Sequence, residues 1–305
     1  MSFIKATDKR FNYHGRWDRT EDGMMRSHWT AYFEFKIKAS SVSFFFDRRT
    51  KGYCYDVDGV RMSNVGSGAD LTFALDPSKF QTIRITYGNG EFPMYFKGIE
   101  TDGEIMSAPN KSNYALFIGD SFTTAGTSYA RSIIAAKKCD YLFLALTGIA
   151  LCDGHGTYNE NPVGMETAFF HLECPKENVP LTELNTKKLR VPDEIYINIG
   201  TGDELENDKN TENFINTYVE FVDKLEKLWP KAKYYILLPA FDSENGLKFS
   251  TIEAAAKEIT AKWKNAKFID TREVEIPVAN DGVSPTAEGY KVYSEFVLKK
   301  LKIKK

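Results

Sequence analysis

The chain has 305 residues, a length that fits two domains better than one. Hydrophobic residues make up 42% of it and charged residues 27%, and the formal net charge is -2, all ordinary values for a globular protein. This charge balance excludes a general attraction to nucleic acid or to an anionic membrane, so we expect neither as a partner. The first residues lack the apolar stretch of a signal peptide, and no run of about 18 or more apolar residues predicts a membrane span.

The first third of the chain alternates between apolar and polar residues. In WTAYFEFKIKAS, residues 29–40, the apolar Phe33, Phe35 and Ile37 interleave with charged residues, a pattern that indicates a half-buried strand. Similar short runs follow and are separated by turn sequences rich in glycine, asparagine and aspartate. Several short strands at this spacing predict a β-sandwich.

After about residue 105 the pattern changes to apolar strands separated by amphipathic helices. The apolar runs are found in NYALFIGDS, DEIYINIGTGDE, AKYYILLPA and AKFIDTR, with TENFINTYVEFVDKLEKLW as one of the helices between them. This alternation predicts a parallel sheet. We therefore expect an α+β protein of two domains. Residues 1–108 form a jelly-roll-like β-sandwich, and residues 109–305 form an α/β domain with a flavodoxin-like parallel sheet.

The cysteines and histidines do not show the spacing of a metal site. Four cysteines, at positions 54, 139, 152 and 174, form no C-x-x-C pair and have no metal-like spacing with the four histidines. The even number of cysteines leaves disulfide pairing open. We expect neither a metal nor a cofactor.

Ligand sites in an open parallel sheet form at the carboxyl ends of the strands. Four segments at or near such ends stand out: Gly-Asp-Ser ending at Ser121, the region of Gly148, the IGTGDE turn, and DGVSPT before the last helix. Ser121 directly follows an apolar strand and precedes a helix, which would place its hydroxyl beside N–H groups able to stabilise an oxyanion. The alternative is that Ser121 only caps the helix.

The order of these four segments resembles the four sequence blocks of the SGNH, or GDSL, hydrolases. FIGDSFTTAG matches the first block, and the preceding sandwich with its GRW segment, Gly15 to Trp17, narrows the resemblance to carbohydrate esterase family 2. That family deacetylates plant polysaccharides, and some relatives bind β-glucan chains in the catalytic cleft. The resemblance spans essentially the whole chain. It implies a plant cell-wall polysaccharide or oligosaccharide as the ligand, no cofactor and, by analogy only, secretion.

The resemblance also assigns positions to the catalytic residues. Ser121 matches the nucleophile and follows Asp120, and the backbone N–H groups of Ser121 and Gly148 would form two arms of an oxyanion hole. The third arm is an asparagine in the family, and the matching residue here is Gly202, followed by Asp203. Glycine has no side-chain donor, and losing one such donor typically costs roughly 100- to 1,000-fold in turnover.

The family's catalytic histidine matches Ser284. Asp281 and Pro285 keep their places around it, which supports the match. A serine hydroxyl cannot accept the nucleophile's proton near neutral pH. In subtilisin, removing the histidine alone costs on the order of a million-fold. We therefore expect an acetyl xylan esterase-like protein whose catalysis is impaired or absent.

Three functions fit this reading. The first is a carbohydrate-binding pseudoenzyme that keeps the cleft. The second is an active serine O-deacetylase in which His155, oriented by Asp153, replaces the missing base of Ser121. The third is a protein-interaction module that reuses the fold and presents an exposed apolar patch to a protein partner.

The acidic turn GTGDELEND lacks the spacing of a calcium loop, so we interpret it as a solvated turn.

Overall fold

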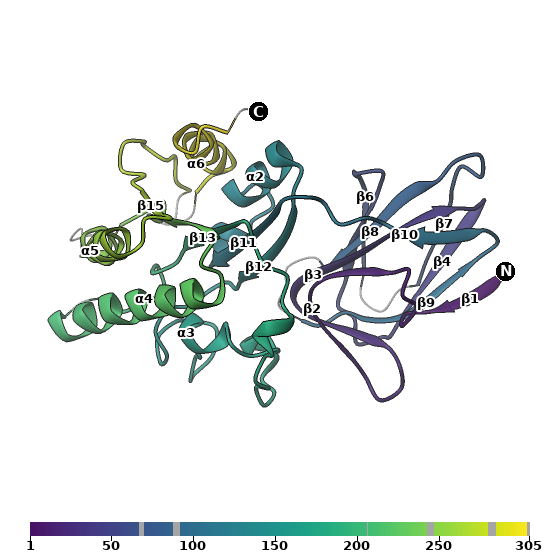
Figure 1. Ribbon diagram of the computed structural model, residues 1–305, viewed down its shortest axis with the longest axis horizontal. Helices are drawn as coiled ribbons and strands as arrows, with labels where there is room; N and C mark the ends of the chain where they lie inside the picture. The colour runs from purple at the N-terminus through teal and green to yellow at the C-terminus, as the bar shows by residue number, and fades with distance from the viewer. Residues whose placement is uncertain (67–69, 88–91, 206, 243–246, 280–284, 304–305) are drawn as a thin grey trace. The chain divides into compact units, whose positions relative to one another are not determined.

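The computed structural model describes residues 1–66, 70–87, 92–205, 207–242, 247–279 and 285–303 (Figure 1). The chain divides into two compact units, one of Met1–Asn110 with Leu172–Pro180, the other of Lys111–His171 with Leu181–Lys305. The sequence pattern did not predict that residues 172–180 belong to the first unit. The domain boundary expected after residue 108 stays a prediction.

The first unit is built from antiparallel strands. They are β1 (Ser2–Lys5), β2 (Asn12–Arg19), β3 (Met25–Lys38), β4 (Ser41–Phe46), β5 (Tyr53–Val57), β6 (Val60–Val65), β7 (Leu71–Ala74), β8 (Gln81–Tyr87), β9 (Tyr95–Thr101) and β10 (Glu104–Ser107). The long strand β3 pairs with β2 and β8, while β9 pairs with β1 and β4. A short 3-10 turn, η1 (Pro175–Glu177), belongs to the same unit.

Strand β3 departs from the half-buried pattern that its sequence indicated. Phe33, Phe35 and Ile37 are fully buried in the core of the first unit, as expected. Glu34, however, is also buried, with only 3% of its surface exposed. Burial of the charged carboxylate is tolerated because the Arg84 guanidinium lies 2.7 Å away and forms a salt bridge with it.

The second unit contains a parallel sheet. Its strands are β11 (Tyr114–Gly119), β12 (Asp140–Ala145), β13 (Glu194–Asn198), β14 (Lys233–Leu237) and β15 (Ala266–Ile269). They run parallel in the spatial order β12-β11-β13-β14-β15. Counted along the chain this is the order 2-1-3-4-5 of flavodoxin-like sheets, so the predicted α/β domain is confirmed. Strands β11 and β12 are buried along their whole length, which explains the apolar runs YALFI and YLFLA within them.

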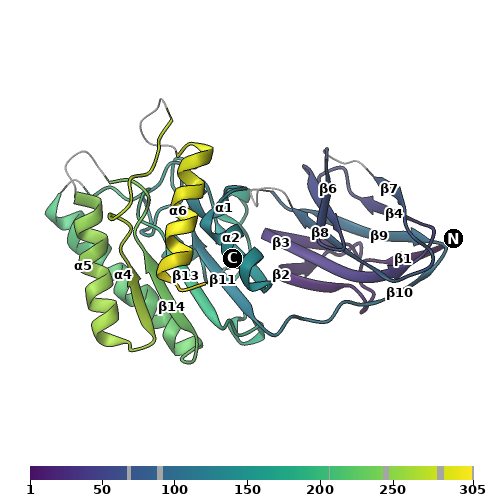
Figure 2. The same cartoon turned by 90° about the horizontal axis from the view of Figure 1, so that it is seen from above.

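Helices flank the parallel sheet. They are α1 (Ser121–Thr124), α2 (Tyr129–Lys137), α3 (Met165–Ala168), α4 (Asp208–Leu228), α5 (Leu247–Lys262) and α6 (Ala287–Lys300), with the 3-10 turn η2 (Thr186–Lys188). Helices α2 and α6 pack against each other, as do α4 and α5 (Figures 1 and 2). Within the described ranges, no helix combines the length and apolar character that crossing a membrane requires. The four cysteines all lie in the described part of the chain, and none of them forms a disulfide there.

Candidate functional site

The sheet order brings three of the predicted segments to one place. Strand β11 lies between β12 and β13. Ser121 begins the helix that follows β11, and Gly148 and Gly202 lie in the loops after β12 and β13. The order of the strands reverses between β11 and β13, and ligand sites of flavodoxin-like sheets form at this switch point. The loops after β12 and β13 touch, because a Cβ added at Gly202 would lie 2.8 Å from the carbonyl oxygen of Ile149.

Ser121 does not cap its helix. It is the first residue of α1, and the capping side chain is that of Asp120, which accepts a hydrogen bond from the Phe122 N–H at 2.9 Å. Ser121 is half-buried. Of the residues that the structure describes, none is hydrogen-bonded to its hydroxyl or to its backbone N–H. Helix capping therefore does not explain the serine at this position.

Asp120 is the buried member of a chain of polar contacts at the switch point. Only 2% of its surface is exposed, and the hydroxyl of Thr201, in the loop after β13, donates a hydrogen bond to the Asp120 carboxylate. Lys248, in the first turn of α5, donates in turn to the Thr201 carbonyl. Burial raises the pKa of Asp120 because it disfavours the charged carboxylate, and this outweighs the hydrogen bonds from Thr201 and Phe122. The chain ties the ends of β11 and β13 to α5.

Gly148 has a conformation and surroundings that require glycine. Its φ angle is +80°, and an added Cβ would lie 2.6 Å from the Thr157 hydroxyl oxygen. Its carbonyl accepts a hydrogen bond from the Thr157 N–H at 2.8 Å. Within the described part of the chain, its own N–H makes no hydrogen bond. A backbone donor therefore remains available here.

The turn at Gly202 and Asp203 is not the solvated turn that its acidic sequence indicated. Asp203 is 2% exposed, and its two carboxylate oxygens accept the N–H groups of Leu151, at 2.8 Å, and Cys152, at 3.0 Å. The solvated interpretation is wrong for Asp203 because the loop after β12 supplies these two donors. The carboxylate fastens the loop after β13 to the loop after β12.

His155 lies next to Asp203 rather than Asp153. Its Nδ1 is 3.7 Å from Asp203 Oδ1 and 3.3 Å from the backbone nitrogen of Glu204. The Asp203 carboxylate is the main cause of a raised His155 pKa, opposed by partial burial and supported by the charge of Glu204. In the neutral ring, Nδ1 can accept a hydrogen bond from the Glu204 N–H. In the protonated ring, Nδ1 carries a proton that is directed toward the Asp203 carboxylate.

Asp153 has other partners, so the expectation that it orients His155 is wrong. One of its carboxylate oxygens accepts the Gly164 N–H at 2.7 Å, and the other accepts the Thr167 hydroxyl at 2.6 Å. These bonds tie Asp153 to the residues around the start of α3. Their donors lie 11 and 14 residues further along the chain, which no local sequence pattern would reveal.

Two of the predicted site residues, Asp281 and Ser284, lie outside the described residues. The described chain resumes at Pro285, which forms an antiparallel bridge with Val278. Thr286 then caps α6, its hydroxyl accepting the Gly289 N–H at 3.0 Å. The predicted helix start after Ser-Pro-Thr is therefore confirmed.

Thr201 and Lys248 are polar residues of the site region that sequence reasoning missed, because no motif distinguishes them.

A search of family models and a search of curated proteins found no match to this chain. Solved structures that match it over nearly its whole length include carbohydrate esterases of family two. The acetyl xylan esterase Est2A from Butyrivibrio proteoclasticus has a TM-score of 0.78 at 15% identity, covering 99% of this chain and 98% of its own. The esterase from Cellvibrio japonicus has a TM-score of 0.81 at 16% identity, covering 99% of this chain and 97% of its own. The esterase from Clostridium thermocellum, solved with cellohexaose, has a TM-score of 0.78 at 16% identity, covering 96% of this chain and 98% of its own.

These structures share the fold of this chain. The resemblance to SGNH hydrolases of carbohydrate esterase family 2, inferred from the order of four sequence blocks, is therefore confirmed at the level of the fold. Identities of 15% and 16% carry nothing beyond the fold. What the site does must be argued from its residues.

Proposed function

We propose that this protein is a carbohydrate-binding pseudoenzyme with the fold of family-two carbohydrate esterases. The observation that carries the proposal is the environment of Gly202, the position of the oxyanion asparagine in the family. A Cβ at this position would approach the Ile149 carbonyl oxygen to 2.8 Å, so an asparagine here would require the backbone of the neighbouring loop to shift. Ser284 in place of the catalytic histidine is a second, independent loss. Together they remove a proton acceptor and one oxyanion donor.

Binding capacity survives these losses. The Ser121 hydroxyl and the Ser121 and Gly148 N–H groups have no partner among the described residues, so they are available to a ligand hydroxyl or carbonyl. The related esterase from Clostridium thermocellum carries cellohexaose. We therefore propose a plant cell-wall glycan as the ligand, with a β-glucan chain as the first candidate. We also retain the proposal that residues 1–108 form a jelly-roll-like sandwich domain.

Isothermal titration with cellohexaose tests the proposal, with maltohexaose as a control of equal length and different linkage. We expect saturable heat with cellohexaose and none with maltohexaose. Absence of heat with cellohexaose and with xylan and mannan oligosaccharides of similar length would overturn carbohydrate binding.

An active O-deacetylase is the second candidate, and the pairing of His155 with Asp203 favours it. A histidine beside a buried carboxylate is the arrangement that orients the base in serine hydrolases. This candidate predicts that His155→Ala abolishes acetate release as completely as Ser121→Ala. If His155→Ala leaves a measurable turnover intact, His155 is not the base. The hypothesis of a protein-interaction module stays a prediction.

A further inference from the structure

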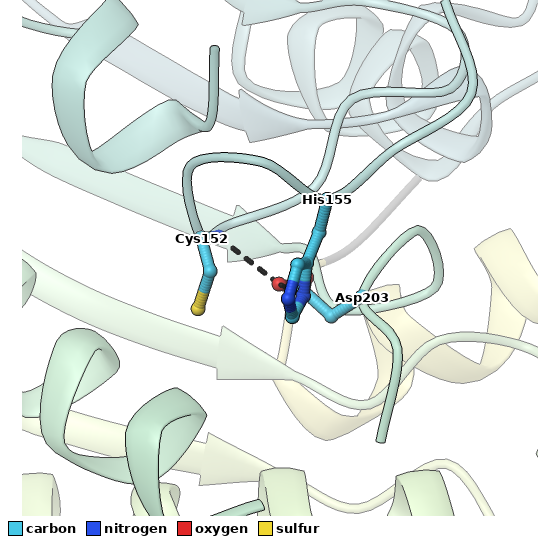
Figure 3. Close-up of side chains that lie close together, drawn as sticks. All are labelled: Cys152, His155 and Asp203. Atoms are coloured by element: carbon cyan, nitrogen blue, oxygen red, sulfur yellow. Dashed lines mark hydrogen bonds and ion pairs between the residues drawn. The ribbon is translucent and has the colours of Figure 1, made fainter. Parts of the chain in front are cut away.

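Cys152, His155 and Asp203 lie together in the second unit, although their positions in the sequence do not suggest a site (Figure 3). Cys152 and His155 belong to the loop after β12, and Asp203 to the loop after β13. One possible ligand atom from each residue lies within 4.8 Å of the other two. We propose that this cluster binds a divalent transition-metal ion, with zinc as the first candidate.

The three donors have the chemistry that zinc uses in proteins. Thiolate, imidazole and carboxylate bind zinc at about 2.3, 2.0 and 2.0 Å, so their donor atoms lie roughly 3 to 4 Å apart around a tetrahedral ion. The donor atoms lie within 4.8 Å of one another, somewhat further apart than around a bound ion, and binding would draw them together by side-chain rotation. Three protein ligands would leave a fourth position for water.

The charges around the cluster also favour a cation. Asp203, Glu204 and Glu166 all act on His155 as negative charges, and Asp203 and Glu166 act on Cys152 in the same way. The imidazole of His155 can supply at most a single positive charge against these carboxylates. A divalent ion would offset this excess and replace the proton of the Cys152 thiol.

The surroundings already orient the ligands. Each Asp203 oxygen accepts one backbone N–H, from Leu151 or from Cys152, and keeps a lone pair for a metal. The bond from Cys152 is drawn in Figure 3. The Glu204 N–H contact to His155 Nδ1 is long, at 3.3 Å, and little is lost if the metal takes its place. His155 has 17% of its side chain exposed, which gives an ion access, whereas Cys152 is buried.

The inference does not rest on glycan binding, because none of its ligands is among the groups proposed to contact the glycan. It excludes the second candidate function, since a metal-bound His155 cannot act as the base of Ser121. Its consequence is structural. A metal held by these residues would join the loops after β12 and β13 and so hold Gly148 and Gly202 in place.

Cobalt(II) titration of the full chain, first freed of metal with a chelator, tests the proposal. We expect one equivalent to produce a thiolate-to-cobalt charge-transfer band and the visible bands of a tetrahedral ion. One equivalent of zinc should then abolish both sets of bands. Cys152→Ser should lose the charge-transfer band, whereas Cys54→Ser, which removes a thiol of the other unit, should keep it.

His155→Ala provides a second route, because Cys152 is buried and its replacement can disturb folding. We expect this variant to fold, as judged by circular dichroism, and to bind zinc at least roughly tenfold more weakly in calorimetry. Zinc should raise the melting temperature of the original chain and have little effect on that of His155→Ala. The proposal is overturned if cobalt gives no saturable charge-transfer band, if Cys152→Ser keeps it, or if His155→Ala binds zinc as tightly as the original chain. Cellohexaose binding is read separately, so either proposal can fail without the other.

Discussion

At the residue scale, a neighbouring backbone restricts the size of the side chain at position 202 and favours glycine there. A side chain there would press on the carbonyl of Ile149, which belongs to the loop that carries Gly148. The backbone cannot yield as a flexible side chain would. The path of the loop after β12 therefore favours glycine at position 202.

Gly202→Ala tests this contact. We expect the free energy of unfolding to fall by roughly 1–3 kcal/mol, because the new methyl group overpacks a rigid backbone. Urea denaturation measures the change. The matched control is Gly126→Ala, since a Cβ at Gly126 meets nothing within 4 Å and the substitution should be nearly neutral or slightly stabilising. Equal stability of the two variants would show that the Ile149 contact is not a constraint.

At the scale of elements, the loops after β12 and β13 are joined by one carboxylate. Asp203→Asn replaces an oxygen by an NH₂ group, so one of the Leu151 and Cys152 N–H groups would lose its acceptor. We expect a loss of roughly 1–3 kcal/mol in unfolding free energy, measured in the presence of a chelator. Glu204→Gln is the control at an exposed neighbouring position and should change little. A neutral Asp203→Asn would contradict the account of this junction.

Residues 172–180 are held in the first unit by buried polar contacts with β3. The Trp29 indole donates to the Glu173 carbonyl at 3.1 Å, and His28 contacts Glu177 through Nδ1, at 3.2 Å, and Asp18 through Nε2, at 3.1 Å. Burial alone would lower the pKa of His28, but the two carboxylates outweigh it and raise the pKa above 6.5.

This histidine predicts a pH dependence of stability. A raised folded-state pKa means that its contribution is complete below the unfolded-state value of 6.5 and is lost as pH rises through the folded-state value. The difference in unfolding free energy between the original chain and His28→Gln should therefore be largest at mildly acid pH and shrink toward alkaline pH. Denaturation curves at several pH values measure it. A difference that grows with pH would show that His28 is neutral in the folded protein.

The parallel sheet was predictable because buried parallel strands have uninterrupted apolar sequences, as β11 and β12 do. The position of Ser121 followed from the same pattern, since it comes directly after such a strand. Glu34 was not predictable from alternation, because its burial depends on Arg84, 50 residues away. The approach of Asp203 to Cys152, 51 residues earlier, likewise depends on which loops the sheet brings together.

At the scale of the whole molecule, the chain has the fold of the family-two esterases, and we propose that the positions that perform the chemistry in that family have changed. Fold similarity at 15% to 18% identity does not carry activity with it. In this proposal Ser121 and Gly148 keep the residue types of the catalytic machinery, and Ser284 and Gly202 stand at the acid–base and third oxyanion positions. Loss of the base alone is enough to stop a serine hydrolase from turning over at a useful rate.

The most direct test is acetate release from acetylated xylan and glucomannan by the original chain and by Ser121→Ala under identical conditions. The account predicts that the two release acetate at the same background rate, because Ser121 has no base to activate it. Acetate release by the original chain well above that of Ser121→Ala would contradict the account and establish a working esterase with a base outside the expected position.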